Sequence, residues 1–486
     1  MKANTSKTFI SKDILFYLPA KLIEGIVGLL TLNLYTKLFT AKVIGEYGLV
    51  NPTVAVTFLI LLGWLMHGIY RYVNAYKEKD QLAELYTTSI VSYLLCAGVV
   101  GLGIIGLVIF NNPWFSNALL LSAFYLFVAY GLAQIMLNLL VALKKIKLNL
   151  LLSVGSAIGK LILTIILAVY YKKEVTVILI SHGTMDLCVA LIIFLRLNMH
   201  RYFVMSKFSR ETLKTMLNFG YPLIGLSLTM FVLNQSDRYI IKYYHGEAAA
   251  GIYFANYSLA SAIYMMMIMG IMRAVYPNLL LAWQQKDKEK ATHLLSGGVR
   301  YYLMLCIPAT VGIILLAKPI SYLVLDVKVH GYSKIVAWTA IGMLFFGLTE
   351  YCNKAWELTG KTKTILYNSL ISGIINIALN FILVPRYGFY FAAITTVISF
   401  ATYLLLSSIG ARRIFIWHVK PGTWLRILLS AATFGTVIWI IGQHYTFTVL
   451  ILIVTIILSI IIYFTLLLLT GELKEEIKML KKIRKK

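Results

Sequence analysis

Residues 447–470 read FTVLILIVTIILSIIIYFTLLLLT, a run without a single charged side chain. A helix that crosses a bilayer needs about 20 consecutive, mostly apolar residues, so this run predicts a transmembrane helix. The whole chain of 486 residues is 60% hydrophobic and 13% charged, whereas soluble globular proteins contain about 45–50% apolar and about 25% charged residues. The composition therefore excludes a soluble enzyme and indicates an integral membrane protein.

Working outward from this run, the sequence predicts an all-α polytopic protein with about fourteen transmembrane helices. The other thirteen apolar stretches are 14–36, 47–70, 87–110, 118–142, 149–170, 176–195, 217–241, 250–276, 299–322, 335–358, 365–384, 389–410 and 424–442. The longest loops, 196–216 and 278–298, have only about 20 residues, too few for an extramembrane catalytic domain. We therefore expect a protein that is not an enzyme, which argues against membrane glycosyltransferases and polymerases.

The charge balance predicts the orientation. The chain has 45 Lys and Arg against 19 Asp and Glu, a net charge of +26. With the N-terminus in the cytoplasm, the inner loops and tails hold about 31 of the 45 basic residues, the outer loops about 9 and the spans about 5, as the positive-inside rule requires. We expect both termini to be cytoplasmic, and no nucleic-acid partner is needed to explain the charge.

Motifs for cofactors are not apparent. The four cysteines, Cys96, Cys188, Cys306 and Cys352, fall inside apolar runs without metal-ligand spacing. The G-x-G-x-x-G spacing over 101–106 lies within an apolar span, where it indicates helix packing rather than a dinucleotide site. We expect no metal and no cofactor, and an energy source other than ATP.

Short matches separated by about 202–206 residues indicate an internal repeat. Gly45-Glu-Tyr47 recurs as Gly251-Ile-Tyr253, and Gly68-Ile-Tyr-Arg71 recurs as Gly270-Ile-Met-Arg273. Six spans therefore repeat as the next six, in the same orientation because six is even. Many transporters are built from such repeats, and the prediction is two six-helix lobes around a central cavity, followed by two further helices.

The repeat sets the expected domain boundaries. Spans 1–6 form an N-terminal lobe over 1–195, a cytoplasmic linker covers 196–216, spans 7–12 form a C-terminal lobe over 217–411, and spans 13–14 occupy 412–470. The tail 471–486 is basic. It is predicted either to lie on the membrane as an amphipathic helix or to be a solvated segment that only sets topology.

Several motifs give the chain a specific resemblance. Asn218-Phe-Gly-Tyr-Pro-Leu-Ile224, Leu233-Asn-Gln-Ser-Asp-Arg-Tyr-Ile-Ile241, Thr359-Gly-Lys-Thr-Lys363 and Asn376-Ile-Ala-Leu-Asn380 resemble segments of Wzx-type polysaccharide flippases. These belong to the multidrug/oligosaccharidyl-lipid/polysaccharide exporter superfamily. The resemblance implies a bacterial inner-membrane flippase that moves undecaprenyl-diphosphate-linked oligosaccharide from the inner to the outer leaflet by alternating access, for the synthesis of O-antigen, capsule or exopolysaccharide. Membrane lipids and the polymerase and glycosyltransferases of the same pathway are its implied partners.

Two relatives in the same superfamily remain as alternatives. A cation-coupled multidrug exporter is expected to line its cavity with acids, whereas the candidate cavity residues here are mostly basic. A flippase for the lipid-linked peptidoglycan precursor handles the same diphosphate carrier. The Asp237-Arg238 pair within the seventh span favours the polysaccharide branch over both.

Ionisable residues inside membrane spans are costly and are functional candidates by default. The cations expected to bind the diphosphate or sugar are Lys21, Arg71, Arg273 and Lys354. Arg71 and Arg273 occupy equivalent places in the two repeats, and guanidinium groups bind phosphate through paired hydrogen bonds. Both residues are equally well explained as basic residues that flank the helix ends and set topology.

Acidic residues near these cations suggest ion pairs. Glu24 is three residues from Lys21 and is expected either to tune it or merely to neutralise it. Glu350 and Glu357 share a helix face with Lys354, which therefore looks more like a network member than a free phosphate receptor.

Two further pairs lie within spans. Lys160 and Asp186 are at matching depth in neighbouring spans and predict a buried ion pair, with Asp186 as a proton or sodium coupling site as the alternative. Asp237 and Arg238 lie near the outer end of the seventh span. They are expected to lock an outer gate rather than to contact substrate.

Overall fold

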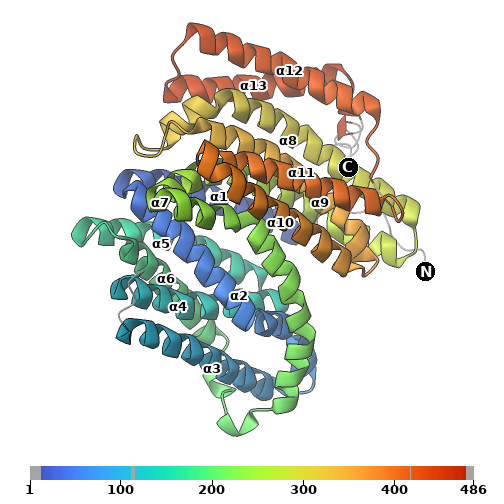
Figure 1. Cartoon of the computed structure of the whole chain (residues 1–486). Helices are drawn as coiled ribbons and strands as arrows, with labels where there is room; N and C mark the ends of the chain where they lie inside the picture. Colours follow the sequence, from blue (N-terminus) through green and yellow to red (C-terminus); the bar gives the residue numbers. More distant parts are fainter. Residues whose placement is uncertain (1–11, 111–114, 416, 475, 478–486) are drawn as a thin grey trace. The chain divides into compact units, whose positions relative to one another are not determined.

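The chain is all-helical, as the sequence predicts, in a computed structural model (Figure 1). The structure describes residues 12–110, 115–415, 417–474 and 476–477, with side chains from residue 23 onward except 222–223. Within these residues there is no β-strand.

Thirteen α-helices follow one another along the described chain. They are α1 (Lys12–Leu38), α2 (Ala41–Glu78), α3 (Leu82–Ile109), α4 (Asn117–Ala142), α5 (Ile146–Tyr170), α6 (Val175–Arg196), α7 (Arg210–Gln284), α8 (Lys288–Val324), α9 (Ser333–Leu358), α10 (Thr362–Tyr387), α11 (Phe391–Ala411), α12 (Pro421–His444) and α13 (Val449–Leu469). Two short 3₁₀ turns, η1 (Met199–Arg201) and η2 (Met205–Lys207), lie in the loop before α7.

The helices coincide with the predicted spans. Twelve of them, counted over the described residues, are long and apolar enough to cross a membrane. One of the twelve is Ile224–Gln284 within α7, and α7 as a whole contains the two predicted spans 217–241 and 250–276. They are separated at Gly246, whose φ of 82° and ψ of 178° break the helical conformation. Helix α1 matches the remaining predicted span, 14–36.

The chain divides into two compact units, and α7 continues from one into the other. The N-terminal unit comprises Leu15–Gly251, and the C-terminal unit comprises Ile252–Lys486 together with the start of the chain up to Ile14. This boundary lies later than the linker 196–216 predicted from the repeat. The reason is local packing, because the first part of α7 contacts α2 near both of its ends, as described below.

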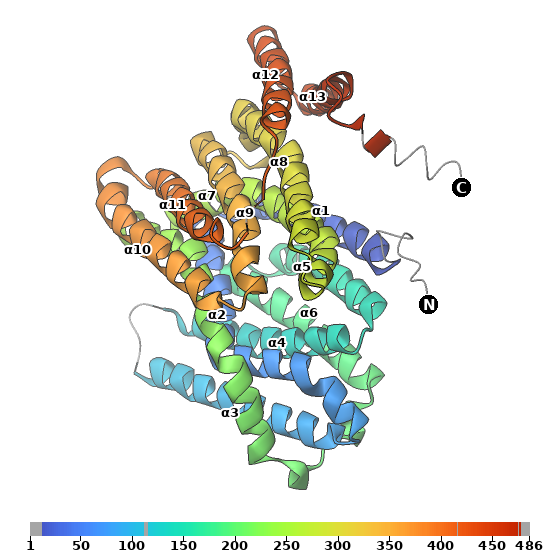
Figure 2. The same ribbon diagram turned by 90° about the vertical axis from the view of Figure 1, so that its right-hand side faces the viewer.

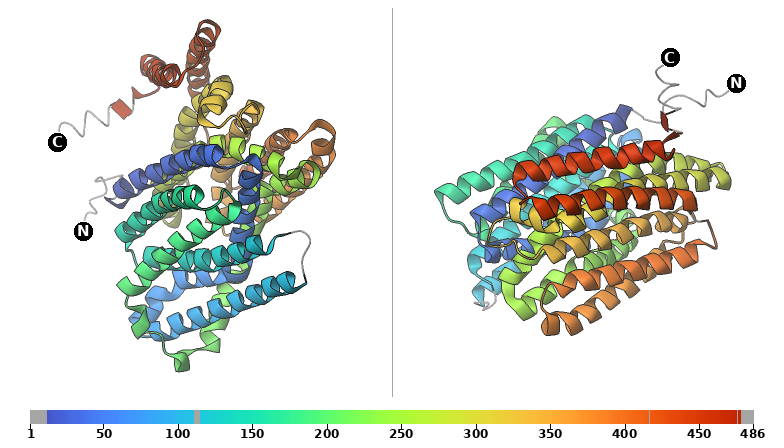
Figure 3. Two further views of the ribbon diagram at one scale, coloured as in Figure 1. Left: turned by 90° about the vertical axis from the view of Figure 1, so that its left-hand side faces the viewer. Right: turned by 90° about the horizontal axis from the view of Figure 1, so that it is seen from above.

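Within the N-terminal unit, α4 is the central helix. It contacts α6, α2, α3 and α5, and α2 also contacts α3 and α6. Figure 3 shows these helices running alongside one another. A single cluster of buried residues connects them, with Phe58, Leu62 and Leu65 from α2 and Leu126, Leu139 and Leu140 from α4.

Within the C-terminal unit, α9 packs between α8 and α11, and α10 packs on α11 (Figure 2). The last two helices, α12 and α13, form a hairpin that lies against α8. Tyr463 fixes this hairpin, since its hydroxyl donates to the carbonyl oxygen of Met304 at 2.8 Å. The two C-terminal helices therefore extend the six-helix repeat through contacts with α8.

Candidate functional site

Helices α2 and α7 run antiparallel and contact each other near both ends of the first part of α7. At one end Gly68 lies against Met216, and one turn earlier Gly220 lies against the backbone of Trp64. Further along, the hydroxyls of Thr53 and Tyr239 are 2.8 Å apart. A β-carbon on Gly220 would overlap the backbone of Trp64, so only glycine permits so close an approach.

At the other end of this contact, two glycines meet that the repeat makes equivalent. A β-carbon on Gly45 would overlap the carbonyl oxygen of Glu247, and one on Gly251 would overlap the carbonyl oxygen of Ala41. Glu247 lies four residues before Gly251, and Ala41 lies four residues before Gly45, so the contact is reciprocal. A local two-fold axis therefore passes between them, as expected where two copies of one motif pack together.

Charged side chains surround the glycine crossing. Lys42 lies 3.6 Å from Glu247 of α7 and 3.9 Å from Glu46 of its own helix, and Lys242 lies 3.2 Å from Glu247. These are partly exposed pairs, each worth up to about 1 kcal/mol. Their contribution is mainly to hold α2 and α7 in register, while the glycines set the separation.

The two equivalent arginines, Arg71 and Arg273, are both exposed at the surface of their units. The guanidinium carbon of Arg71 lies 5.6 Å from the ring centroid of Phe219 on α7, within the range of a cation–π contact. Arg273 lies on the second part of α7 and makes polar contacts of its own. The exposure of both agrees with a role in binding an anion and equally with a topological role.

Helix α1 contains the predicted Lys21–Glu24 pair. The helix runs unbroken over both positions, which places them on one face. The side chain of Lys21 lies outside the described residues, so the pair itself stays a prediction. Glu24 is half-buried and takes part in polar contacts.

Lys354 is a member of a charged network, as its neighbours in sequence predict. It is 7% exposed, and its Nζ lies 2.6 Å from Oε1 of Glu357 and 5.3 Å from the ring centroid of Tyr276. Glu350 interacts with Lys354 electrostatically from one turn earlier. Because Lys354 is buried and neutralised by Glu357, this geometry favours the network over a free phosphate-binding cation.

Lys160 on α5 and Asp186 on α6 form an ion pair, with 2.6 Å between Nζ and Oδ1. The side chain of Asp186 is 7% exposed and that of Lys160 24%. The second carboxylate oxygen of Asp186 is buried and has no hydrogen-bond partner among the described residues. The pairing is therefore as predicted, and a coupling role for Asp186 stays the alternative.

A second buried polar group, His182, lies one turn before Asp186 on α6. Its Nε2 is 3.0 Å from the hydroxyl of Tyr35 on α1, and the same hydroxyl donates to Oγ1 of Thr164 on α5 at 3.0 Å. His182 is therefore a hydrogen-bonded interior histidine.

Asp237 and Arg238 lie on α7 at 3% and 6% exposure. Nη1 of Arg238 donates to the carbonyl oxygen of Gly48 on α2 at 3.3 Å. Asp237 has polar contacts as well. Arg238 therefore ties α7 to α2 at Gly48, three residues after Gly45 of the glycine crossing, a position suited to the predicted gate.

Sequence reasoning missed a buried charged network in the C-terminal unit. Glu472, whose side chain is 3% exposed, accepts from Nε of Arg300 at 2.7 Å, Nη1 of Arg426 at 2.9 Å and Oγ1 of Thr423 at 3.0 Å. Nη1 of Arg300 also donates to Oε1 of Glu476 at 2.6 Å. The start of the basic tail is thus pinned to α8 and α12.

These contacts change the acidity of the tail carboxyls. Burial alone raises the pKa of the Glu472 carboxyl, but the hydrogen bonds from Arg300, Arg426 and Thr423 outweigh it and hold the pKa below its ordinary value. The pKa of Glu476 is lowered against burial in the same way, chiefly by Arg300. The presence of Glu472 and Glu476 in a basic tail is a signal that the sequence offers. Their partner Arg300 could not be identified from it, because Arg300 lies more than 170 residues earlier.

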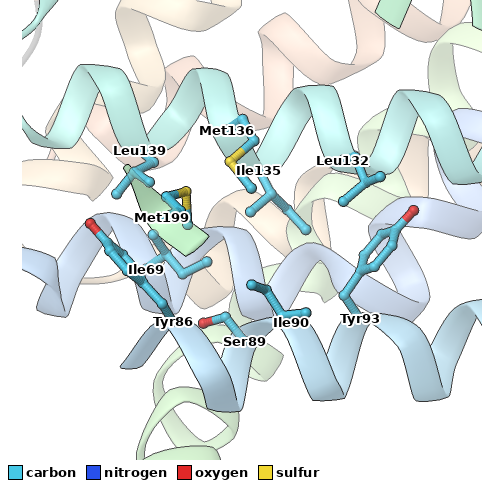
Figure 4. Close-up of a pocket in the computed structure, with 10 residues that line it drawn as sticks. All are labelled: Ile69, Tyr86, Ser89, Ile90, Tyr93, Leu132, Ile135, Met136, Leu139 and Met199. Atoms are coloured by element: carbon cyan, nitrogen blue, oxygen red, sulfur yellow. The ribbon is translucent and has the colours of Figure 1, made fainter. Parts of the chain in front are cut away.

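A small cavity in the N-terminal unit is apolar (Figure 4). It lies among α2, α3, α4 and η1, and its volume is about 20 Å³, room for about one water molecule. The hydroxyls of Tyr86 and Tyr93 lie at its two ends and point away from each other (Figure 4). It is a packing gap and contributes nothing to a substrate site.

Comparison with protein families finds two matches along the chain. Residues 10–283 match the family described as polysaccharide biosynthesis protein, more than half of the chain. Residues 222–382 match the MatE family. The two matches overlap over residues 222–283, within α7, and together they span residues 10–382.

A curated relative and two solved structures are similar to this chain. The probable lipid II flippase MurJ of Rickettsia prowazekii (strain Madrid E) is 26% identical over 179 residues, which span 35% of this chain and 35% of that protein. A lipid II flippase MurJ in an inward closed conformation has a TM-score of 0.74 at 17% identity, covering 94% of this chain and 99% of that one. An inward-facing multidrug resistance MATE family transporter has a TM-score of 0.63 at 15% identity over 80% and 94%. At these identities the structures establish the fold.

Proposed function

The chain belongs to the polysaccharide biosynthesis protein family, within the multidrug/oligosaccharidyl-lipid/polysaccharide exporter superfamily, and from this premise we propose that it is a flippase for undecaprenyl-diphosphate-linked oligosaccharide. It moves this lipid from the inner to the outer leaflet of a bacterial inner membrane during synthesis of a surface polysaccharide. The observation that carries the proposal is the match of residues 10–283 to that family.

The physical task is to bring a diphosphate and several sugars across hydrocarbon while the polyprenyl tail stays in lipid. No covalent bond has to change. Exposed guanidinium groups at equivalent places in both repeats, Arg71 and Arg273, suit the diphosphate because arginine binds phosphate through paired, charge-assisted hydrogen bonds. We assign them to the diphosphate.

Alternating access needs an end of the protein that closes and opens again. The glycine crossing of Gly45 and Gly251, with Arg238 beside it, joins α2 to α7 at the end that the predicted topology places outside. We assign this crossing to the outer gate. Close contact between helix backbones gives many weak interactions that are lost together when the helices separate, which suits a gate with two states.

A lipid II flippase is the second candidate, and the relative from Rickettsia prowazekii supports it. Both candidates recognise a polyprenyl diphosphate and differ in the sugar. Because the proposed site residues Arg71 and Arg273 are basic, a multidrug exporter for cationic drugs is disfavoured.

The test is translocation in proteoliposomes that contain the full chain. A fluorescent undecaprenyl-diphosphate oligosaccharide and fluorescent lipid II are each supplied, and an impermeant quencher reports the leaflet. Faster protein-dependent flipping of the oligosaccharide lipid supports the proposal. Selective flipping of lipid II replaces it with the second candidate. Protein that is folded but moves neither, with or without a proton or sodium gradient, refutes both.

A further inference from the structure

A cavity of about 600 Å³ lies in the C-terminal unit, among α8, α9, α11 and the segment 412–420 that joins α11 to α12. Its size falls within the range of about 300–1,000 Å³ typical of ligand sites. None of the residues assigned to transport lines it. The residues that line the cavity indicate which ligand it suits.

The wall formed by α11 changes from apolar to cationic along one line. Leu404, Ser408 and Arg412 line the cavity and are spaced four residues apart, so they lie above one another on one helix face. At 1.5 Å rise per residue the line is about 12 Å long. It begins with an aliphatic side chain inside the span and ends with a guanidinium at the helix end.

The segment after α11 covers the cationic end. Phe415, Trp417 and His418 line the cavity there, and the backbone N–H of His418 donates to Oγ of Ser296 on α8 at 2.8 Å. The indole N–H of Trp417 is buried beside the thiol of Cys352, so the guanidinium of Arg412 is the cation that the lining offers at this end. The polar end of the cavity therefore offers donors and no acid among its lining residues.

The change from an apolar to a cationic lining along the cavity suits an amphiphile with an anionic head. A free anion would use Arg412 but would leave the apolar half of the cavity empty, and a hydrocarbon chain alone would leave Arg412 without an anionic partner. In the predicted topology the end of α11 lies at the cytoplasmic surface, where basic pockets between helices bind anionic lipid heads. We propose that the cavity binds one anionic phospholipid of the cytoplasmic leaflet, with its phosphate at Arg412 and an acyl chain along Leu404.

The proposal goes beyond the transport function and does not depend on it. A bound lipid fills the space between α9, α11 and the segment 412–420, and so stabilises the connection between the repeat and the C-terminal hairpin of α12 and α13. Removal of the lipid should therefore lower the melting temperature of the protein.

Native mass spectrometry of the delipidated full chain in detergent tests the site. The probes are dioleoylphosphatidylglycerol, dioleoylphosphatidylcholine and inorganic phosphate. We expect one phosphatidylglycerol to bind at least about tenfold more tightly than phosphatidylcholine, because both heads carry the same phosphodiester but the choline cation cancels the net charge of phosphatidylcholine and is repelled by Arg412. Arg412→Ala and Leu404→Trp should each abolish this preference, the first by removing the cation and the second by filling the apolar half.

Two neighbouring substitutions are matched controls. Arg413→Ala removes the same charge one residue away, and Leu405→Trp adds the same bulk at an exposed position; neither residue lines the cavity. Equal losses for Arg412→Ala and Arg413→Ala would show attraction to surface charge and overturn the proposal. Competition by millimolar phosphate would indicate a free-anion site, and displacement by one equivalent of polyprenyl diphosphate would indicate the transported lipid; either result overturns the assignment to phospholipid.

Discussion

Gly45 and Gly251 face each other across the contact between α2 and α7, and a β-carbon on either would overlap the carbonyl oxygen four residues before the other. Sequence repetition identifies them as equivalent, and the structure places them together. We therefore expect Gly45→Ala and Gly251→Ala each to destabilise the protein by about 1–3 kcal/mol or more, as overpacking against backbone does.

Thermal melting of detergent-purified variants checks this expectation. Gly155→Ala on α5 is the control, because a β-carbon there meets nothing within 4 Å. It should leave the melting temperature unchanged or raise it, since alanine has a higher helix propensity than glycine. Equal melting temperatures for all three variants would contradict the close packing.

The ion pair of Lys160 and Asp186 leads to a second prediction. Asp186→Asn leaves a largely buried ammonium without its partner, so we expect a loss of about 3 kcal/mol in stability and lower abundance in the membrane. The double substitution Lys160→Met with Asp186→Leu removes both charges and should recover most of the loss. If Asp186→Asn keeps normal stability while transport loses its dependence on an ion gradient, Asp186 is a coupling site and not a structural one.

The Glu472 network predicts a pH dependence. Because the folded state lowers the pKa of Glu472, its stabilising effect is complete above the ordinary glutamate pKa of about 4.3 and is lost as the pH falls through the lower, folded value. The melting temperature of the wild type should therefore fall in this acidic range. Glu472→Gln should melt lower at neutral pH and lose part of that acid dependence.

Glu289→Gln serves as the comparison for this experiment, since Glu289 is an exposed glutamate on α8. It should melt like the wild type at neutral pH and keep the acid dependence. An unchanged acid response in Glu472→Gln would assign that response to other carboxyls.

The paired arginines give a prediction for transport. Arg71→Ala with Arg273→Ala should reduce flipping in proteoliposomes at least tenfold without loss of membrane expression, because charge-assisted contacts to the diphosphate are removed. Lys77→Ala with Lys286→Ala removes the same number of charges near the ends of α2 and α7 and should leave the rate unchanged. Normal flipping in the arginine variant would remove both residues from the site.

The predicted topology can be checked by cysteine labelling in a variant without the four native cysteines. An impermeant maleimide applied to intact cells should label Gln443→Cys, which lies in the last turn of α12, but not Lys482→Cys in the tail. Both positions should react after the membrane is permeabilised. Labelling of Lys482→Cys in intact cells would reverse the orientation.

The fold class and the positions of the helices follow from the amino-acid sequence alone. Runs of about 20 apolar residues specify membrane helices because every backbone N–H and C=O must be satisfied within the helix in hydrocarbon. This local rule placed α13 and its predecessors without knowledge of their neighbours. Matching depth also anticipated the pairing of Lys160 with Asp186, since charges within a membrane seek partners.

Only the tertiary structure decided which distant residues meet. The repeat marks Gly45 and Gly251 as equivalent, yet nothing in either motif requires them to touch. Arg300 binds Glu472 across 172 residues, and the cavity at Arg412 is formed by three helices and a connecting segment. Such contacts depend on how helices pack, which is set by the shapes of many side chains together and leaves no short pattern in the chain.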